Sequence, residues 1–300
     1  MNTNVLERAL SASHTKKGRL QRAALALLRE HGEAGAIPTS IRFLFYEAVQ
    51  RGIVSKEQRP AERPGERPRR PDQDFSEAVM DLRRLGIVPW DWIVDETRHV
   101  DEWRYASSVA EFIQDSVAVA RLDLWDREPS PLILCESRSL SGVLAPTARQ
   151  YLCALAATNG QVGGFLVTTI VPMFRDHPDR RILYLGDWDH QGHQIEAATR
   201  RRLEDHVGEL DWELLAVTDE QVDEHELRRF ARTKRDKRYK PNGIVHEAIE
   251  TETLGQSIIV GLLQDRLDEL LPVPLEDVLE RERAQREGVA ELLGGLGTNR

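Results

Sequence analysis

The hydrophobic positions of the first ninety residues recur with the period of an α-helix. Three amphipathic helices are predicted, over residues 17–31, 40–51 and 74–85, and Gly32 and Gly86 follow the first and the third as stop signals. Each helix has one apolar stripe, so we expect the three to pack around a common core.

Residues 87–98 alternate apolar and polar side chains, which predicts a short β-hairpin. Three helices followed by a hairpin form a winged helix-turn-helix, a fold that commonly binds DNA. The alternative is a winged helix used only for protein contacts. Residues 57–73 hold four prolines and five arginines, and we expect a basic loop there because proline disrupts both helices and strands.

The pattern changes after residue 130. Short apolar runs predict buried strands at residues 132–135, 164–171, 180–186 and 212–217. Helical patterns occupy residues 106–126, 139–160 and 193–207, and two further helices are expected beyond about residue 244. Strands that alternate with helices indicate parallel βαβ units.

The expected fold class is therefore α/β, with two domains and a tail. An N-terminal winged helix-turn-helix precedes a Rossmann-like parallel sheet, and a helical extension follows. The expected boundaries are 1–105 for the DNA-binding domain, 106–130 for a connecting helix, 131–240 for the sheet domain and 241–300 for the extension. A chain of 300 residues is long enough for two domains to bury separate cores.

Charge is distributed unevenly along the chain. The net charge is -9, yet residues 1–90 carry about +5 and residues 241–300 about -7. A basic N-terminal part favours a nucleic-acid partner, although ordinary solvated surface is the alternative. No apolar run approaches the length of a membrane span, no secretory pattern is visible, and the two cysteines lie in apolar surroundings. A cytoplasmic protein without membrane contact is expected.

Carboxylates follow two of the predicted strands. Glu136 comes directly after the first, and Asp187 and Asp189 come directly after the third. Ligands of open parallel sheets bind beyond the carboxyl ends of the strands, so the three acids are expected to share one crevice. Clustered hard oxygen ligands suit Mg2+, with Mn2+ as an alternative. Gly192 allows the backbone to turn sharply before the next helix.

These motifs carry a family resemblance. Glu136 at a strand end, together with the segment GDWDHQGHQI, resembles the Toprim domain of topoisomerases, bacterial primases and several nucleases. The resemblance covers about residues 131–218, and His190 and Gln191 stand where the usual motif has a shorter spacing before its glycine. It implies that Glu136 is an acid-base or metal-linked residue and that Asp187 and Asp189 are metal ligands.

A second resemblance lies in the segment SIRFLFYEAVQRG of the second helix. It is similar to a segment of topoisomerase VI A subunits and their meiotic double-strand-break relatives, in which the last tyrosine attacks DNA. On this basis Arg42 and Tyr46 are catalytic candidates, with Tyr46 the nucleophile, whereas Phe43 departs from the family's aspartate. Arg42 lies one helical turn before Tyr46 and can steady a phosphate. The alternative role for Tyr46 is core packing.

The resemblance implies a Mg2+-dependent DNA topoisomerase-like or endonuclease-like enzyme. It also implies a homodimer, because each family active site combines two subunits, and a separate ATPase partner, because this chain has no Walker-type glycine loop. Two alternatives remain. One is a Toprim hydrolase that forms no covalent adduct, and the other is a non-catalytic DNA-binding module with a degenerate Toprim fold in a phage or defence complex.

Basic residues in three places are candidate phosphate contacts. The candidates are Arg63, Arg67, Arg69, Arg70, Arg83, Arg84, Lys234, Arg235, Lys237 and Arg238. Solvated surface is the alternative for each group. Glu250 and Glu252 are either additional metal ligands or an acidic cluster favoured by a helix N-terminus, and the sequence favours the second interpretation.

Overall fold

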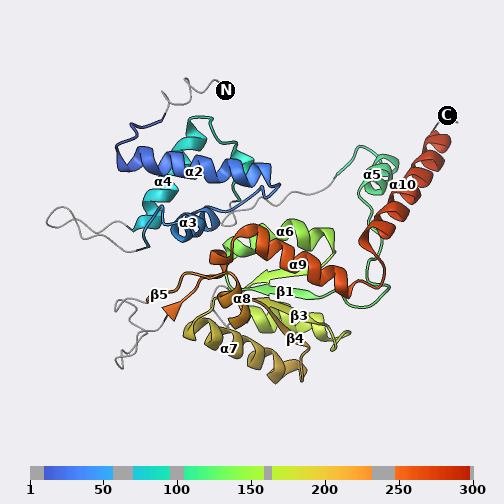
Figure 1. Cartoon of the computed structure of the whole chain (residues 1–300). Coiled ribbons are helices and arrows are strands. Elements are labelled where there is room, and N and C mark those ends of the chain that lie inside the picture. Colours follow the sequence, from blue (N-terminus) through green and yellow to red (C-terminus); the bar gives the residue numbers. More distant parts are fainter. Residues whose placement is uncertain (1–9, 57–69, 95–104, 159–163, 232–246, 298–300) are drawn as a thin grey trace.

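The computed structural model describes residues 10–56, 70–94, 105–158, 164–231 and 247–297. A group of N-terminal helices lies beside an α/β part in which helices cover both faces of a parallel sheet (Figure 1). The α/β class with a parallel sheet is therefore confirmed. Among the described helices there is no candidate membrane span.

The N-terminal helices are α2 (Lys16–Glu33), α3 (Ile41–Gln50) and α4 (Pro71–Arg84). Their apolar stripes meet in one core that includes Leu28, Leu44 and Phe75. The side chain of Ser40 caps α3 by accepting a hydrogen bond from the backbone N–H of Phe43 at 3.2 Å. The three predicted helices are confirmed, but α4 begins at Pro71, inside the predicted loop, because proline is well suited to the first helical position.

The predicted hairpin after α4 is wrong for its described part. Residues 87–94 contain a 3-10 turn, η1 (Trp90–Trp92), and a single parallel bridge between Thr39 and Ile93 instead of a strand. Pro89 precedes the turn, fixes its own φ and lacks the N–H that a strand would donate. Residues 95–98 lie outside the described residues, so a winged helix is not confirmed.

The sheet has the strand order β2-β1-β3-β4, and all of its pairs are parallel. The strands are β1 (Leu132–Cys135), β2 (Ala154–Ala157), β3 (Ile182–Leu185) and β4 (Trp212–Ala216). Alternate residues of β1 face opposite layers, as the period of a strand requires. Ile133 packs towards α6 (Arg138–Gln150) and α9 (Gln256–Leu270), whereas Leu134 packs towards α7 (His190–Val207).

Two sequence predictions within this part are wrong. The strand expected at residues 164–171 is helical, comprising η2 (Leu166–Ile170) and η3 (Val171–Phe174), and Leu166, Ile170 and Phe174 pack on the sheet. The helix expected over residues 139–160 ends at Gln150 and is followed by β2. These corrections give the sheet β2 as an edge strand in place of the predicted second strand.

The remaining elements are short or belong to the C-terminal part. They are α5 (Val109–Ala118), α8 (Asp219–Glu224), the antiparallel pair β5 (Phe230–Ala231) and β6 (Glu247–Ala248), η4 (Thr251–Leu254) and α10 (Leu275–Gly297). The connecting helix expected over residues 106–126 is confirmed only as α5, which has no buried residue and packs beside α10 (Figure 1). Phe112 and Ile113 of α5 are exposed.

The N-terminal helices are joined to the sheet domain by polar contacts and by one aromatic side chain. Gln256 at the start of α9 donates hydrogen bonds from Nε2 to the carbonyl oxygens of Ala36 and Pro38, at 2.9 and 3.0 Å. The hydroxyls of Ser40 and Ser139 lie 2.5 Å apart. Phe43 of α3 is buried in the core that covers one face of the sheet. These contacts bring α3 close to the strand ends.

Candidate metal centre

Parallel pairing brings Glu136 and Asp187 to the same edge of the sheet. Cys135 is paired with Leu185, and the backbone N–H of Glu136 donates to the carbonyl of Leu185 at 3.0 Å. The N–H of Asp187 donates to Oε2 of Glu136 at 3.3 Å. The structure therefore places two of the three predicted metal ligands side by side, although about fifty residues separate them along the chain.

A backbone bridge brings a third acid to this edge. Trp188 and Ile249 form an antiparallel bridge, with both N–H to carbonyl distances at 2.9 Å. In such a pair the neighbours of the bridged residues also face one another, so Glu250 comes to lie near Asp187. The next residue fixes the arrangement, because Thr251 donates from both its backbone N–H and its hydroxyl to Oδ1 of Asp187, each at 2.9 Å.

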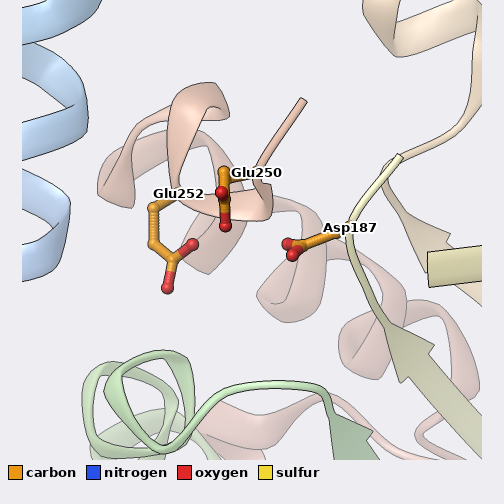
Figure 2. Close-up of side chains that lie close together, drawn as sticks. All are labelled: Asp187, Glu250 and Glu252. Atoms are coloured by element: carbon orange, nitrogen blue, oxygen red, sulfur yellow. The ribbon is translucent and has the colours of Figure 1, made fainter. Parts of the chain in front are cut away.

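Asp187, Glu250 and Glu252 form a compact group of carboxylates, which we call the acidic cluster. Each offers a ligand oxygen, and these oxygens lie within 4.8 Å of one another, so the cluster could hold a metal ion. Figure 2 shows the three side chains close together, with Asp187 approaching from the strand end and the two glutamates from the segment around η4. All of the donors are hard oxygen atoms, the type that Mg2+ and Mn2+ prefer.

Glu252 gives an independent indication of a ligand. Its side chain is only 1% exposed, and Oε1 accepts a hydrogen bond from the hydroxyl of Ser137 at 2.9 Å. Oε2 is buried and has no hydrogen-bond partner among the described residues. A buried carboxylate oxygen without a donor is costly, and a bound cation would remove that cost.

Asp189, the third predicted ligand, has a structural role at the start of α7. Its carboxylate caps α7 and accepts a hydrogen bond from the backbone N–H of Gly192 at 2.8 Å. It is not part of the acidic cluster. Gly192 is required at this turn because a Cβ there would lie 2.0 Å from the carbonyl oxygen of Asp187. Gly192 thus lets the start of α7 approach the backbone of Asp187.

Two cations from the N-terminal part contact the acidic cluster. Arg42 forms an ion pair with Glu250 and another, at 2.8 Å, with Glu252. The ammonium of Lys56 lies 2.8 Å from Glu250. Burial by itself would raise the pKa of Glu250, but Lys56 and Arg42 outweigh it and hold this pKa at about 2.

Asp187 and Glu136, in contrast, have raised pKa values because they are buried among other acids. Burial, followed by the charges of Glu250 and Glu252, raises the pKa of Asp187 well above its usual value. Burial is also the main reason why the pKa of Glu136 is raised. Among the described residues, the carboxylates of Glu136, Asp187, Glu250 and Glu252 outnumber the two cations Arg42 and Lys56. A divalent cation would reduce that excess.

Tyr46 lies beside the acidic cluster within the same chain. Its side chain is 7% exposed and lies close enough to Glu250 to help lower the pKa of that carboxyl. The ammonium of Lys56 is 4.8 Å from the centre of its ring, and the guanidinium of Arg42 is 5.5 Å from it. Burial first, and the charge of Glu250 second, raise the pKa of Tyr46 above its usual value. Tyr46 and the acidic cluster therefore lie together within one chain, whereas the family resemblance implies that they come from two subunits.

The candidate DNA-binding residues are only partly described. Arg70, Arg83 and Arg84 all lie on or next to α4, away from the acidic cluster in sequence. Arg83 stacks on Trp90 at 4.2 Å from the ring centre and donates to its carbonyl oxygen, whereas Arg70 and Arg84 form ion pairs with neighbouring aspartates. Seven candidates lie outside the described residues: Arg63, Arg67, Arg69, Lys234, Arg235, Lys237 and Arg238.

Comparisons with known proteins identify no relative. No model of a protein family, no curated protein and no solved structure matches the chain. The interpretation of the acidic cluster therefore rests on its own geometry.

Sequence reasoning undervalued Glu250 and Glu252. The favoured interpretation, acids placed at a helix N-terminus, describes their position correctly, because Glu250 precedes η4 and Glu252 lies in its first turn. It missed that their carboxylates also contact Arg42, Lys56 and Ser137. The available signal was the spacing of two acids by one residue in IETETLG, which repeats the spacing of Asp187 and Asp189. Nothing in that segment by itself indicates its pairing with Trp188.

Proposed function

We propose that the protein is a metal-dependent enzyme that cleaves DNA strands, with a Toprim-like sheet domain and an N-terminal DNA-binding domain. The observation that supports this proposal is the acidic cluster, at the carboxyl edge of a parallel sheet, with an unpartnered oxygen on Glu252. Three carboxylates suit a Mg2+ or Mn2+ ion that takes its remaining ligands from water and phosphate.

Such an ion would supply electrostatic stabilisation to the phosphate oxygens during strand cleavage. The chain's own residues supply the rest. Arg42 and Lys56 offer positive charge at the same place, and a guanidinium can bind a phosphate through two hydrogen bonds. Thr251 fixes the orientation of Asp187 through two hydrogen bonds. Tyr46 lies beside Glu250 and helps to lower its pKa.

Two nucleophiles are compatible with this arrangement. Attack by Tyr46 would join its oxygen to phosphorus and release the sugar oxygen, as the family resemblance implies. Hydrolysis by water is the second candidate, and it is favoured by the burial and raised pKa of Tyr46, which keep the phenol protonated. Both reactions break the same phosphodiester bond and depend on the same carboxylates.

A plasmid-cleavage assay tests the proposal. Supercoiled DNA is incubated with the protein and Mg2+ or Mn2+, with EDTA as the metal-free control, and the products are denatured before electrophoresis. We expect nicked or linear DNA only with metal, and at least a hundredfold less with Asp187→Asn or Glu252→Gln. Asp205→Asn, a change of an exposed residue on α7, is the matched control and should leave cleavage intact.

The tyrosine variant then distinguishes the two nucleophiles. Protein-linked DNA that disappears in Tyr46→Phe would support transesterification, whereas cleavage that persists in Tyr46→Phe without an adduct would support hydrolysis. DNA binding without metal-dependent cleavage, in the presence of correctly folded protein, would refute the enzymatic proposal and favour the DNA-binding module. Sedimentation of the same samples tests the homodimer, and reactions without ATP test whether strand breakage needs an ATPase partner.

A further inference from the structure

Two cavities meet at the C-terminal end of α6, away from the acidic cluster. One has a volume of about 320 Å³ and lies between the α2–α3 connection, α6 and α9. The other, of about 410 Å³, lies between α6 and α10. Both are lined by Pro146 and Gln150, so they adjoin, and we call the two together the groove. Glu136 and Ser137 precede the opposite end of α6, and a helix of 13 residues is about 20 Å long.

The first cavity is uncharged, and one of its lining residues carries an unpartnered acceptor. Its lining combines apolar groups such as Ile37 and Val260 with the amides of Gln150, Gln256 and Gln264. Gln256 is 6% exposed, and its Nε2 is engaged by Ala36 and Pro38. Its Oε1 is buried and has no hydrogen-bond partner among the described residues. A ligand that enters this cavity is therefore expected to be neutral, flat enough to lie against apolar groups, and equipped with an N–H donor.

The second cavity is positively charged. Arg121, Arg149 and Arg286 line it together with one acid, Glu282. Oε2 of Glu282 accepts from Arg121 Nε at 3.0 Å and from the N–H of Leu122 at 2.8 Å, and Oε1 accepts from Arg286 at 2.6 Å. Three guanidinium groups against one carboxylate leave two positive charges, in a chain whose net charge is -9. Guanidinium groups held in this way are suited to a phosphate.

We propose that this groove binds one nucleotide, with its base in the uncharged cavity and its phosphate among the arginines. The exocyclic amino group or ring N–H of the base donates to Oε1 of Gln256, and Arg149, which is exposed, contacts the phosphate. The groove is separate from the acidic cluster and requires no metal. The same nucleotide chemistry is offered by a free nucleoside monophosphate and by the terminal nucleotide of a strand.

Calorimetric titration of the full chain in EDTA tests this site independently of strand cleavage. The ligands are the four nucleoside monophosphates, adenosine, inorganic phosphate and a 5′-phosphorylated pentanucleotide. At least one monophosphate should bind ten times more tightly than both adenosine and phosphate. The ratio of its affinity to that of the pentanucleotide then shows whether the groove takes free nucleotides or strand ends.

Arg149→Gln should weaken nucleotide binding about ten- to a hundredfold, because a hydrogen bond to a charged group is lost. Arg138→Gln, an exposed arginine at the other end of the same helix, is the matched control and should change nothing. Gln256→Leu should reduce the preference for nucleotide over phosphate. Because this change also removes contacts to Ala36 and Pro38, Gln264→Leu provides a second test of the base cavity, with thermal melting as the check of folding.

Three results would overturn the proposal. The first is the absence of binding at millimolar nucleotide, and the second is equal affinity for phosphate and nucleotide. The third is an unchanged affinity in Arg149→Gln. None of them depends on metal, so they leave the proposed DNA cleavage to be judged by the plasmid assay.

Discussion

Replacing Asp187 by asparagine should separate a metal ligand from an ordinary buried acid. In the metal-free protein, two carboxylates whose oxygens lie within 4.8 Å of each other repel by about 3.5 kcal/mol or more at an effective dielectric constant of about 20. Arg42 and Lys56 offset much of this repulsion. Asparagine keeps an oxygen that accepts the two hydrogen bonds of Thr251. We therefore expect Asp187→Asn to stabilise the metal-free protein by about 1–2 kcal/mol, which is about 2–3 °C in Tm for 300 residues.

Metal should reverse this order of stability. A cation at a hundred times its Kd adds about 2.7 kcal/mol, or about 4 °C, to the wild-type protein. The variant lacks one of the three carboxylates and should lose most of that shift. Differential scanning fluorimetry with EDTA, Mg2+ or Mn2+ measures both effects, and Asp205→Asn should behave as the wild type. A variant that is less stable without metal and keeps the full metal shift would refute the assignment.

The pH dependence of the metal-free protein follows from the same carboxyl group. Because the pKa of Asp187 is raised on folding, its contribution to stability is complete below the unfolded pKa, about 3.9, and is lost as the pH rises through the folded pKa. Glu250 acts in the opposite direction, but mainly between about pH 4.5 and 2, because its folded pKa is about 2. Asp187→Asn should flatten the decline towards neutral pH.

Two further substitutions test the surroundings of the cluster. Gly192→Ala should destabilise the protein by more than about 2 kcal/mol, because the added Cβ would overlap a carbonyl oxygen of the backbone. Gly261→Ala in α9 has open space around the added Cβ and should stabilise the protein by about 0.5–1 kcal/mol. Urea unfolding measures both changes. Arg42→Gln should cost about 1–2 kcal/mol without metal, because Glu250 and Glu252 lose a partly exposed cation, and should tighten Mn2+ binding in a calorimetric titration. Tighter binding is expected because Arg42 and the metal ion would compete for the carboxylates of Glu250 and Glu252, and weaker Mn2+ binding by the variant would contradict this.

The strands that the sequence predicted well are short, apolar and bounded by turns. β1, β3 and β4 are of this kind, and the pattern of apolar runs alone assigns the two carboxylates that follow β1 and β3 to one edge of the sheet. The segment GFLVTTIV misled because its β-branched residues favour strands, although Leu166 and Ile170 are spaced to pack as a helix.

The sequence failed to predict the end of α6 for a different reason. The helix ends with the hydrogen bonds of a Schellman motif, from Leu152 to Arg149 and from Cys153 to Ala148. Glycine usually occupies the left-handed position of this motif, but here it is Leu152, with φ at 55°. The stop signal that would have revealed β2 is therefore missing from the sequence.

The sequence predicted Asp187 as a metal ligand but did not predict that Glu250 and Glu252 join it, because Asp187 is placed by a local pattern and the two glutamates by tertiary pairing. Asp187 follows a strand, and a local pattern finds it. Glu250 and Glu252 reach it through the pairing of Trp188 with Ile249, a contact across some sixty residues that no local pattern encodes. The same holds for Arg42, whose ion pairs depend on how the N-terminal helices pack against η4.

The exposure of α5 determines how that helix will exchange its amide protons. It has ten residues, and its packing beside α10 buries none of them. Helices shorter than about 12–15 residues are marginal in water without such burial. Its amides should therefore take up deuterium within seconds, while those of Ile133 and Leu183 in the buried strands stay protonated far longer. Any molecule that covers Phe112 and Ile113 will reveal itself first as a slowing of exchange in this one helix.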